Sequence, residues 1–226
     1  MLWLRSLLLP SSCVVCSSPG EELCAACAGS LTVVGTVRCA RCGTPTVVPV
    51  ERCRECAGRR LAFATARAAV VYDARARALV RAWKEHGVRR LARRAAELIL
   101  EEVPRPDVSA LAAIPADTAR SLRRGRHPAE QLAELLARAW DIPLETTLTR
   151  VRSLPRQRGL TVVERRRNVR DAFAASSAPA RKVALVDDVY TTGATADAAA
   201  RALRRGGTRG VEVITLARVC RRWRVD

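Results

Sequence analysis

The sequence predicts a doubly wound α/β domain with a mainly parallel sheet, preceded by a small domain that metal ions hold together. Eight of the nine cysteines fall within the first 60 residues as four Cys-x-x-Cys pairs. From residue 61 onward, short apolar runs alternate with amphipathic segments, as in a parallel sheet with crossover helices. We therefore expect one domain over residues 1–60 and a second over residues 61–226.

The cysteine pairs are separated by seven, eleven and ten residues. Each pair can present two sulfurs to one tetrahedral Zn²⁺, so four pairs satisfy two closed structural sites. Alternatives are a crossed pairing, an iron–sulfur cluster or a redox dithiol. Cys220 stands apart in an apolar segment and is expected in the core. The expected ligand sets are Cys13, Cys16, Cys24 and Cys27 for one ion, and Cys39, Cys42, Cys53 and Cys56 for the other.

Periodicity and breaker residues place the elements of the second domain. Gly206 and Gly207 supply a helix stop, and the last two strands with the helix between them form a βαβ unit whose crossover should be right-handed. Strands are expected at 64–72, 111–115, 183–186 and 211–219, and helices at 75–83, 89–102, 128–140 and 195–205.

The composition indicates a globular, strongly basic protein. Of the 226 residues 49% are hydrophobic, and the formal net charge is +18. Two zinc ions, each held by four thiolates, would bring that charge nearer +14. A basic domain suits polyanions such as a pyrophosphate-bearing sugar or nucleic acid. Because 38 of the 40 basic residues are arginine, a pattern that codon bias also produces, charge alone selects no ligand.

The first ten residues are apolar but do not read as a signal peptide. Arg5 interrupts them, and no small-x-small cleavage site follows. No other segment approaches the length of a membrane span. We expect a cytoplasmic protein.

Two adjacent carboxylates, Asp187 and Asp188, follow the apolar run 183–186. In open α/β sheets, ligands bind at the carboxyl ends of the strands. The following loop offers hydroxyls and amide N–H groups at a helix amino terminus, which favours a phosphate. The carboxylates suit ribose hydroxyls or Mg²⁺. An ordinary acidic turn is the alternative. The loop consists of Thr191, Thr192, Gly193, Ala194 and Thr195.

The stretch Val-Asp-Asp-Val-Tyr-Thr-Thr-Gly-Ala-Thr resembles the phosphoribosyl pyrophosphate (PRPP) motif of type I phosphoribosyltransferases. The basic segment that precedes it is similar to the signature Arg-x4-Gln-x-Gly-Leu-x4-Arg-x2-Asn-Val-x2-Ala-Phe of the ComF (competence protein F) family. With the cysteine pairs in front, the resemblance covers nearly the whole chain. The signature residues are Arg152, Gln157, Gly159, Leu160, Arg165, Asn168, Val169, Ala172 and Phe173.

The chain departs from the family pattern at two segments. Arg-Gly-Arg-His-Pro stands at 124–128, and Lys-Glu-His-Gly stands at 84–87. Each contains a histidine, and both His86 and His127 are read either as ligand contacts or as solvated surface residues. The acceptor is therefore not readable from these segments.

The resemblance implies a type I phosphoribosyltransferase fold and a PRPP-binding transferase that releases pyrophosphate, with a link to natural competence. Asp187 and Asp188 would hold the ribose and the 191–195 loop the 5′-phosphate, while Mg²⁺, Lys84 and Arg165 would stabilise pyrophosphate. The segment 150–170 would close over the site; a basic linker is the alternative. Other readings are a PRPP sensor, or a competence accessory protein that binds single-stranded DNA or protein partners. The loop residues concerned are Arg152, Gln157, Gly159 and Asn168.

Overall fold

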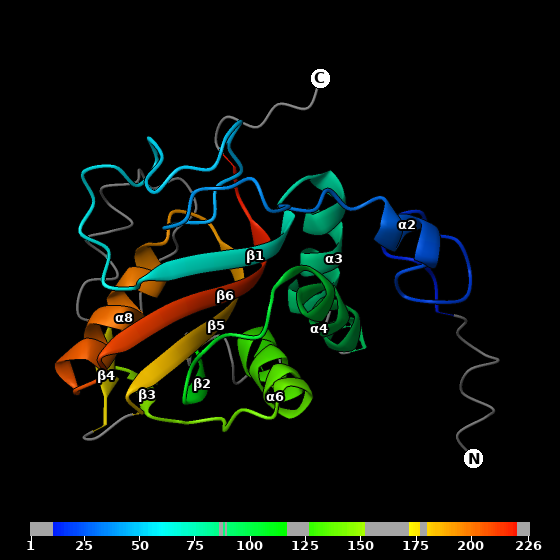
Figure 1. Ribbon diagram of the computed structural model, residues 1–226. Coiled ribbons are helices and arrows are strands. Elements are labelled where there is room, and N and C mark those ends of the chain that lie inside the picture. The colour runs from blue at the N-terminus through cyan, green and yellow to red at the C-terminus, as the bar shows by residue number, and fades with distance from the viewer. Residues whose placement is uncertain are drawn as a thin grey trace, which may run out of the picture.

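A four-stranded parallel sheet forms the centre of the protein (Figure 1). The computed structural model describes residues 11–85, 88, 90–116, 127–151, 172–176 and 180–220. All three strand pairings in the sheet are parallel, as predicted. The strand order is β1 (Thr65–Val71), β6 (Gly210–Arg218), β5 (Lys182–Tyr190) and β2 (Ala110–Ala113).

Helices cover both faces of this sheet, which confirms the doubly wound α/β prediction. Side chains of β5 alternate between the faces, as strand geometry requires. Ala184 and Val186 pack in one core cluster, whereas Val183 and Leu185 pack in another. The first face is covered by α3 (Ala74–Glu85), α4 (Leu91–Glu102) and α6 (Pro128–Trp140), the second by α8 (Ala194–Arg205).

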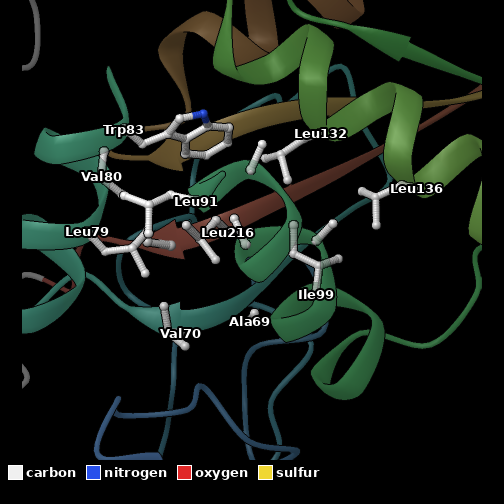
Figure 2. Packing of buried hydrophobic residues seen from close by; sticks show 14 of the residues in the cluster. Ala69, Val70, Leu79, Val80, Trp83, Leu91, Ile99, Leu132, Leu136 and Leu216 are labelled. Atoms are coloured by element: carbon white, nitrogen blue, oxygen red, sulfur yellow. The ribbon is translucent and has the colours of Figure 1, made fainter. Parts of the chain in front are cut away.

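The larger core lies under α3, α4 and α6. Figure 2 shows Trp83, Ile99 and Leu132, one from each helix, meeting near Leu216 of β6. The indole Nε1 of Trp83 donates to Gln131 Oε1 at 3.2 Å, so its polar atom is satisfied within the core. The amphipathic pattern of these segments predicted the three helices, and α6 has the bounds that the sequence predicted.

The structure corrects the expected end of the third strand. The sequence predicted that it ends at residue 186, but β5 continues to Tyr190 because β6 runs beside it as far as Arg218. Asp187 and Asp188 therefore belong to the last half of the strand and do not follow it. The antiparallel pair β3 (Leu148–Arg150) and β4 (Phe173–Ala175) was not predicted; the sequence suggested only loop there.

The cysteine-rich region runs along the outer side of β1. Val34 N donates to Ala69 O at 2.9 Å, and Val71 N donates to Thr32 O at 2.7 Å. A short helix, α2 (Ala25–Gly29), lies in the first part of this region. The region therefore covers the edge of β1 that faces away from β6. The domain boundary at residue 60 stays a prediction.

Cys220 differs from the expectation of a buried strand residue. It lies two residues beyond β6 and is half-buried against Val34, Ala68 and Val71. In the part of the chain that the structure describes, no helix has the length and apolar character needed to cross a membrane.

Candidate functional site

The carboxyl-terminal half of β5 carries the two predicted carboxylates. Asp188 is buried, with 3% of its surface exposed, and Asp187 is half-buried. Each accepts a hydrogen bond from the next main-chain amide: Asp188 N donates to Asp187 Oδ1 at 2.9 Å, and Val189 N donates to Asp188 Oδ1 at 2.8 Å. Neighbouring strand residues face opposite sides of a sheet, so Asp187 and Asp188 lie on opposite faces near the end of β5.

Lys84, from the last turn of α3, reaches the same place. Its Nζ donates to Asp188 Oδ2 in an ion pair, and 42% of its side chain remains exposed. Burial alone would lower the pKa of Lys84, but the charges of Asp188 and Asp187 outweigh it and raise that pKa. The structure thus brings Lys84 to the predicted carboxylates, where it pairs with Asp188; its role toward a ligand stays a prediction.

The two carboxyl groups have opposite pKa shifts. Burial, and then the charge of Asp188, raise the pKa of Asp187 to about 8. Burial would also raise the pKa of Asp188, but the ammonium of Lys84 outweighs burial and lowers that pKa. At neutral pH the pair therefore favours one ionised carboxylate, on Asp188, and one protonated carboxyl group, on Asp187.

The loop after β5 turns directly into α8. Gly193 precedes the helix with φ +71°, a left-handed conformation that glycine adopts without strain. A side chain at this position would also collide with the ring of Tyr190. Thr192 is buried, and its Oγ1 accepts from Ala194 N at 3.3 Å, while Thr191 is exposed. The amide of Ala194, the first residue of α8, is thus bonded to a threonine hydroxyl within the turn.

His127 has a role that the sequence did not suggest. It precedes α6, where its Nδ1 accepts from Ala129 N at 3.4 Å and its own amide donates to Glu130 Oε2 at 3.4 Å. Burial lowers the pKa of His127, and the nearby charge of Asp188 partly offsets that shift. His127 is a half-buried helix cap at the border of the site and not a solvated surface residue.

The eight paired cysteines gather into the two predicted tetrads. In each, all four Sγ atoms lie within 4.8 Å of one another, and no crossed set occurs among the described residues. Thiolates bound to Zn²⁺ at 2.3 Å in a tetrahedron lie about 3.8 Å apart. The Sγ distances are 3.8 Å for Cys16–Cys24, 3.6 Å for Cys39–Cys56 and 3.5 Å for Cys42–Cys53. The tetrads therefore fit two structural zinc ions.

The second tetrad contacts the sheet through Arg218, the last residue of β6. This arginine is 1% exposed. Its guanidinium donates to Cys42 O and Thr44 Oγ1, and Nη2 lies 3.0 Å from Glu55 Oε2 and 3.7 Å from Cys42 Sγ. Nothing in the sequence distinguishes this arginine from 37 others.

Several predicted site residues lie outside the described residues. They are His86, Arg152, Gln157, Gly159, Arg165 and Asn168.

Comparison with known proteins finds similarity both in the cysteine-rich region and along nearly the whole chain. The family model described as a double zinc ribbon domain matches residues 4–57. Competence protein F of Haemophilus influenzae is 41% identical over 104 residues, which are 44% of this chain and 45% of the relative. DNA utilization protein YhgH of Salmonella typhi is 29% identical over 230 residues, or 94% of this chain and 99% of the relative.

A protein of the same name from Escherichia coli K12 is 33% identical over 113 residues, which are 48% of each chain. The matches to the Haemophilus and E. coli proteins therefore span about half of those relatives.

Two cysteine tetrads in front of a mainly parallel, doubly wound sheet define the class of the protein: a zinc-ribbon protein with an α/β domain of the type I phosphoribosyltransferase kind. The named relatives make the assignment narrower. They support an assignment to the ComF family, because the chain is similar to Competence protein F and to DNA utilization protein YhgH.

Proposed function

We propose that the protein binds PRPP at the carboxyl end of β5 and transfers its phosphoribosyl group to an acceptor, releasing pyrophosphate. The observation that carries the proposal is the sequence of groups along the chain: Asp187 and Asp188 at the end of β5, then the Gly193 turn, then the amino terminus of α8. This order supplies carboxylates for ribose hydroxyls and amides for a phosphate within one strand–turn–helix unit.

Each group has a role in the proposed reaction. The buried carboxylate of Asp188 accepts hydrogen bonds from the ribose hydroxyls, and the amides after Gly193 hold the 5′-phosphate. The bond from the ribose C1 to the pyrophosphate oxygen breaks as the acceptor attacks C1, and the electron pair leaves with pyrophosphate. The reaction builds positive charge on the sugar and negative charge on the leaving group, so positioning and electrostatics suffice and no covalent protein nucleophile is needed.

Lys84 is the proposed partner of the pyrophosphate. In the structure it pairs with Asp188, so the arrival of an anionic donor gives its ammonium a second partner. A carboxylate here supplies the oxygen ligands that Mg²⁺ prefers, and such a cation would neutralise charge on the donor. Asp187 binds such a cation only after losing its proton, and therefore better as pH rises toward 8.

The remaining roles follow the family. The tetrads would hold zinc as a structural element, since four thiolates leave no open ligand position. Two relatives are named for competence and for DNA utilization, and on that ground we place this protein in the handling of DNA during uptake. Single-stranded DNA, competence proteins and a cytoplasmic location belong to this proposal.

Pyrophosphate release tests the proposal. The zinc-loaded protein is mixed with PRPP and Mg²⁺ and with nucleobases or small amines as acceptors. We expect release that depends on acceptor and is lost in Asp188→Asn. Asp107→Asn is the matched control, because this carboxylate is 93% exposed and pairs with Lys182 far from the site. Tight PRPP binding without release for any acceptor would instead favour a PRPP sensor.

A further inference from the structure

A basic cavity lies at the edge of the sheet opposite the proposed PRPP site. Its volume is about 620 Å³. It opens where β1 and β6 begin, whereas the proposed PRPP site is at the ends of these strands. Nine-residue β6, at about 3.3 Å per residue, separates the two edges by about 25 to 30 Å. The cavity, called the arginine cleft below, is lined by Arg41, Arg60, Leu61, Ala62, Phe63, Ala64, Arg201, Arg204, Arg205, Arg209 and Gly210.

Six arginines from four parts of the chain meet in the arginine cleft. Arg41 comes from the second ribbon and Arg60 from the segment before β1. Arg201, Arg204 and Arg205 come from α8, and Arg209 comes from the turn after it. Among the described residues that line the cleft, none is acidic. The helix dipole alone would explain the two arginines in the last turn of α8. It does not explain why Arg41 of the ribbon and Arg60 before β1 lie in the same cleft.

Main-chain carbonyls hold several of these guanidinium groups. Arg41 Nη2 donates to Leu61 O at 2.7 Å, Arg201 Nη2 to Arg60 O at 2.7 Å, and Arg204 Nη1 to Arg209 O at 3.3 Å. Arg201 also pairs with Asp197 at 3.1 Å. A carbonyl orients a guanidinium without cancelling its charge, so the cleft holds positive charges in fixed positions. Such an arrangement is stabilised by a polyanion that enters it.

We propose that the arginine cleft binds the phosphodiester backbone of single-stranded nucleic acid. One guanidinium group can donate two parallel hydrogen bonds to the oxygens of one phosphate. Arginines from four segments therefore suit a ligand with repeated phosphates better than a compact anion. A flexible single strand adapts to a concave cleft more readily than a rigid duplex does. Phe63, the aromatic residue of the lining, is fully buried, so bases gain no exposed ring for stacking. Binding is therefore tolerant of sequence and strongly dependent on salt.

This inference rests on the part of the proposed function that concerns single-stranded DNA, and it does not depend on PRPP binding. It assigns the two anionic ligands to opposite edges of one sheet, so that each site can be changed without the other.

Charge reversal tests the assignment. Arg204→Glu/Arg209→Glu changes two exposed arginines of the cleft. Arg93→Glu/Arg138→Glu makes the same change in net charge on α4 and α6, across the sheet from α8. Fluorescence anisotropy measures binding of a labelled oligodeoxythymidylate of about 20 nucleotides. The salt concentration is varied from about 50 to 200 mM. Zinc content and melting temperature show that each variant is folded.

We expect the wild type to give a linear plot of log affinity against log salt, with a slope between about −2 and −4 for three to six phosphates. The cleft variant should lose at least about tenfold in affinity, with a slope shallower by about 1.4 or more, since a single strand contributes about 0.7 per phosphate. The control variant should lose less than about threefold, because it changes only the distant field.

Three results would overturn the proposal. Equal losses in the two folded variants would show that net charge, not the cleft, binds the strand. Equal affinity for a duplex of the same length would show that the concave cleft does not favour a single strand. Displacement of the strand by inorganic triphosphate at the same phosphate concentration would show that the cleft prefers a compact anion.

Discussion

The guanidinium of Arg218 lies over the ring of Tyr190, with its carbon 4.6 Å from the ring centroid. The two residues face each other at the ends of the paired strands β5 and β6. Arg218 also donates to Cys42 O in the second tetrad, and the ring of Tyr190 fills the space beside Gly193. One cation–π contact thus joins the second zinc ribbon to the turn that begins α8.

Replacement of Arg218 should destabilise the protein strongly. Arg218→Met keeps the apolar stem but removes the guanidinium that donates to Glu55, Thr44 and the carbonyl of Cys42. We expect a loss of about 2 to 4 kcal/mol in the free energy of unfolding, because the variant removes one ion pair and two further hydrogen bonds of a buried guanidinium. Urea titration at fixed zinc measures it. Arg138→Met, at an exposed position, should change stability by less than about 0.5 kcal/mol, and a similar small effect at Arg218 would contradict the contacts described.

Each tetrad should bind its own zinc ion, so disrupting one tetrad should leave the zinc of the other in place. The purified protein is expected to hold two zinc ions per chain, one in each cysteine set. Cys39→Ser/Cys56→Ser removes two ligands from one set and should lower the content to one. Cys220→Ser should keep two, since this cysteine belongs to neither set. Metal analysis after gel filtration gives the counts, and an unchanged content in the double variant would refute the assignment.

Gly193→Ala should impair the anion-binding turn more than backbone strain explains. Gly58 has nearly the same positive φ, +72° against +71°, but a Cβ there meets nothing within 4 Å, whereas at Gly193 it meets Tyr190. Gly58→Ala should therefore cost about 1 to 2 kcal/mol of strain alone. Gly193→Ala should cost more and weaken PRPP binding at least about tenfold, because the first turn of α8 must move. Calorimetry and urea titration compare the two, and equal behaviour would count against the role given to Tyr190.

The raised pKa of Asp187 predicts a specific dependence of stability on pH. A folded-state pKa near 8 exceeds the unfolded value, so the folded protein binds this proton more tightly. The stabilisation is complete below the unfolded pKa, decreases as pH rises, and is lost once pH passes about 8. Asp187→Asn has no ionisable group at this position, so its stability does not contain this contribution. The difference in unfolding free energy between wild type and variant should therefore decrease from pH 5 to 8 and then level off, and a difference independent of pH would refute the shift.

The parts of the site that are contiguous in the chain could be predicted from the sequence. Asp187, Asp188 and the 191–195 turn form one strand–turn–helix unit, so their order fixes their geometry. The cysteine sets were also predictable, since each Cys-x-x-Cys pair is a local turn. The end of β5 was not, because two carboxylates look like the start of a loop unless the neighbouring strand is known to continue beside them.

Contacts between distant segments could not be predicted. Arg218 and Cys42 are 176 residues apart, and an arginine at the end of an apolar run gives no sign of burial. The arginine cleft likewise combines a ribbon, a connecting segment and a helix end that only the fold brings together. The strands β3 and β4 have three residues each, too few to show an alternating pattern.

Calorimetric titration of the zinc-loaded protein with PRPP and Mg²⁺, at near-physiological salt, tests the central claim most directly. The account predicts saturable binding to a single class of sites, lost in Asp187→Ala/Asp188→Ala and kept in Asp107→Asn. Absence of binding to the folded wild type, or equal binding by the double variant, would contradict a sugar-phosphate site at the end of β5.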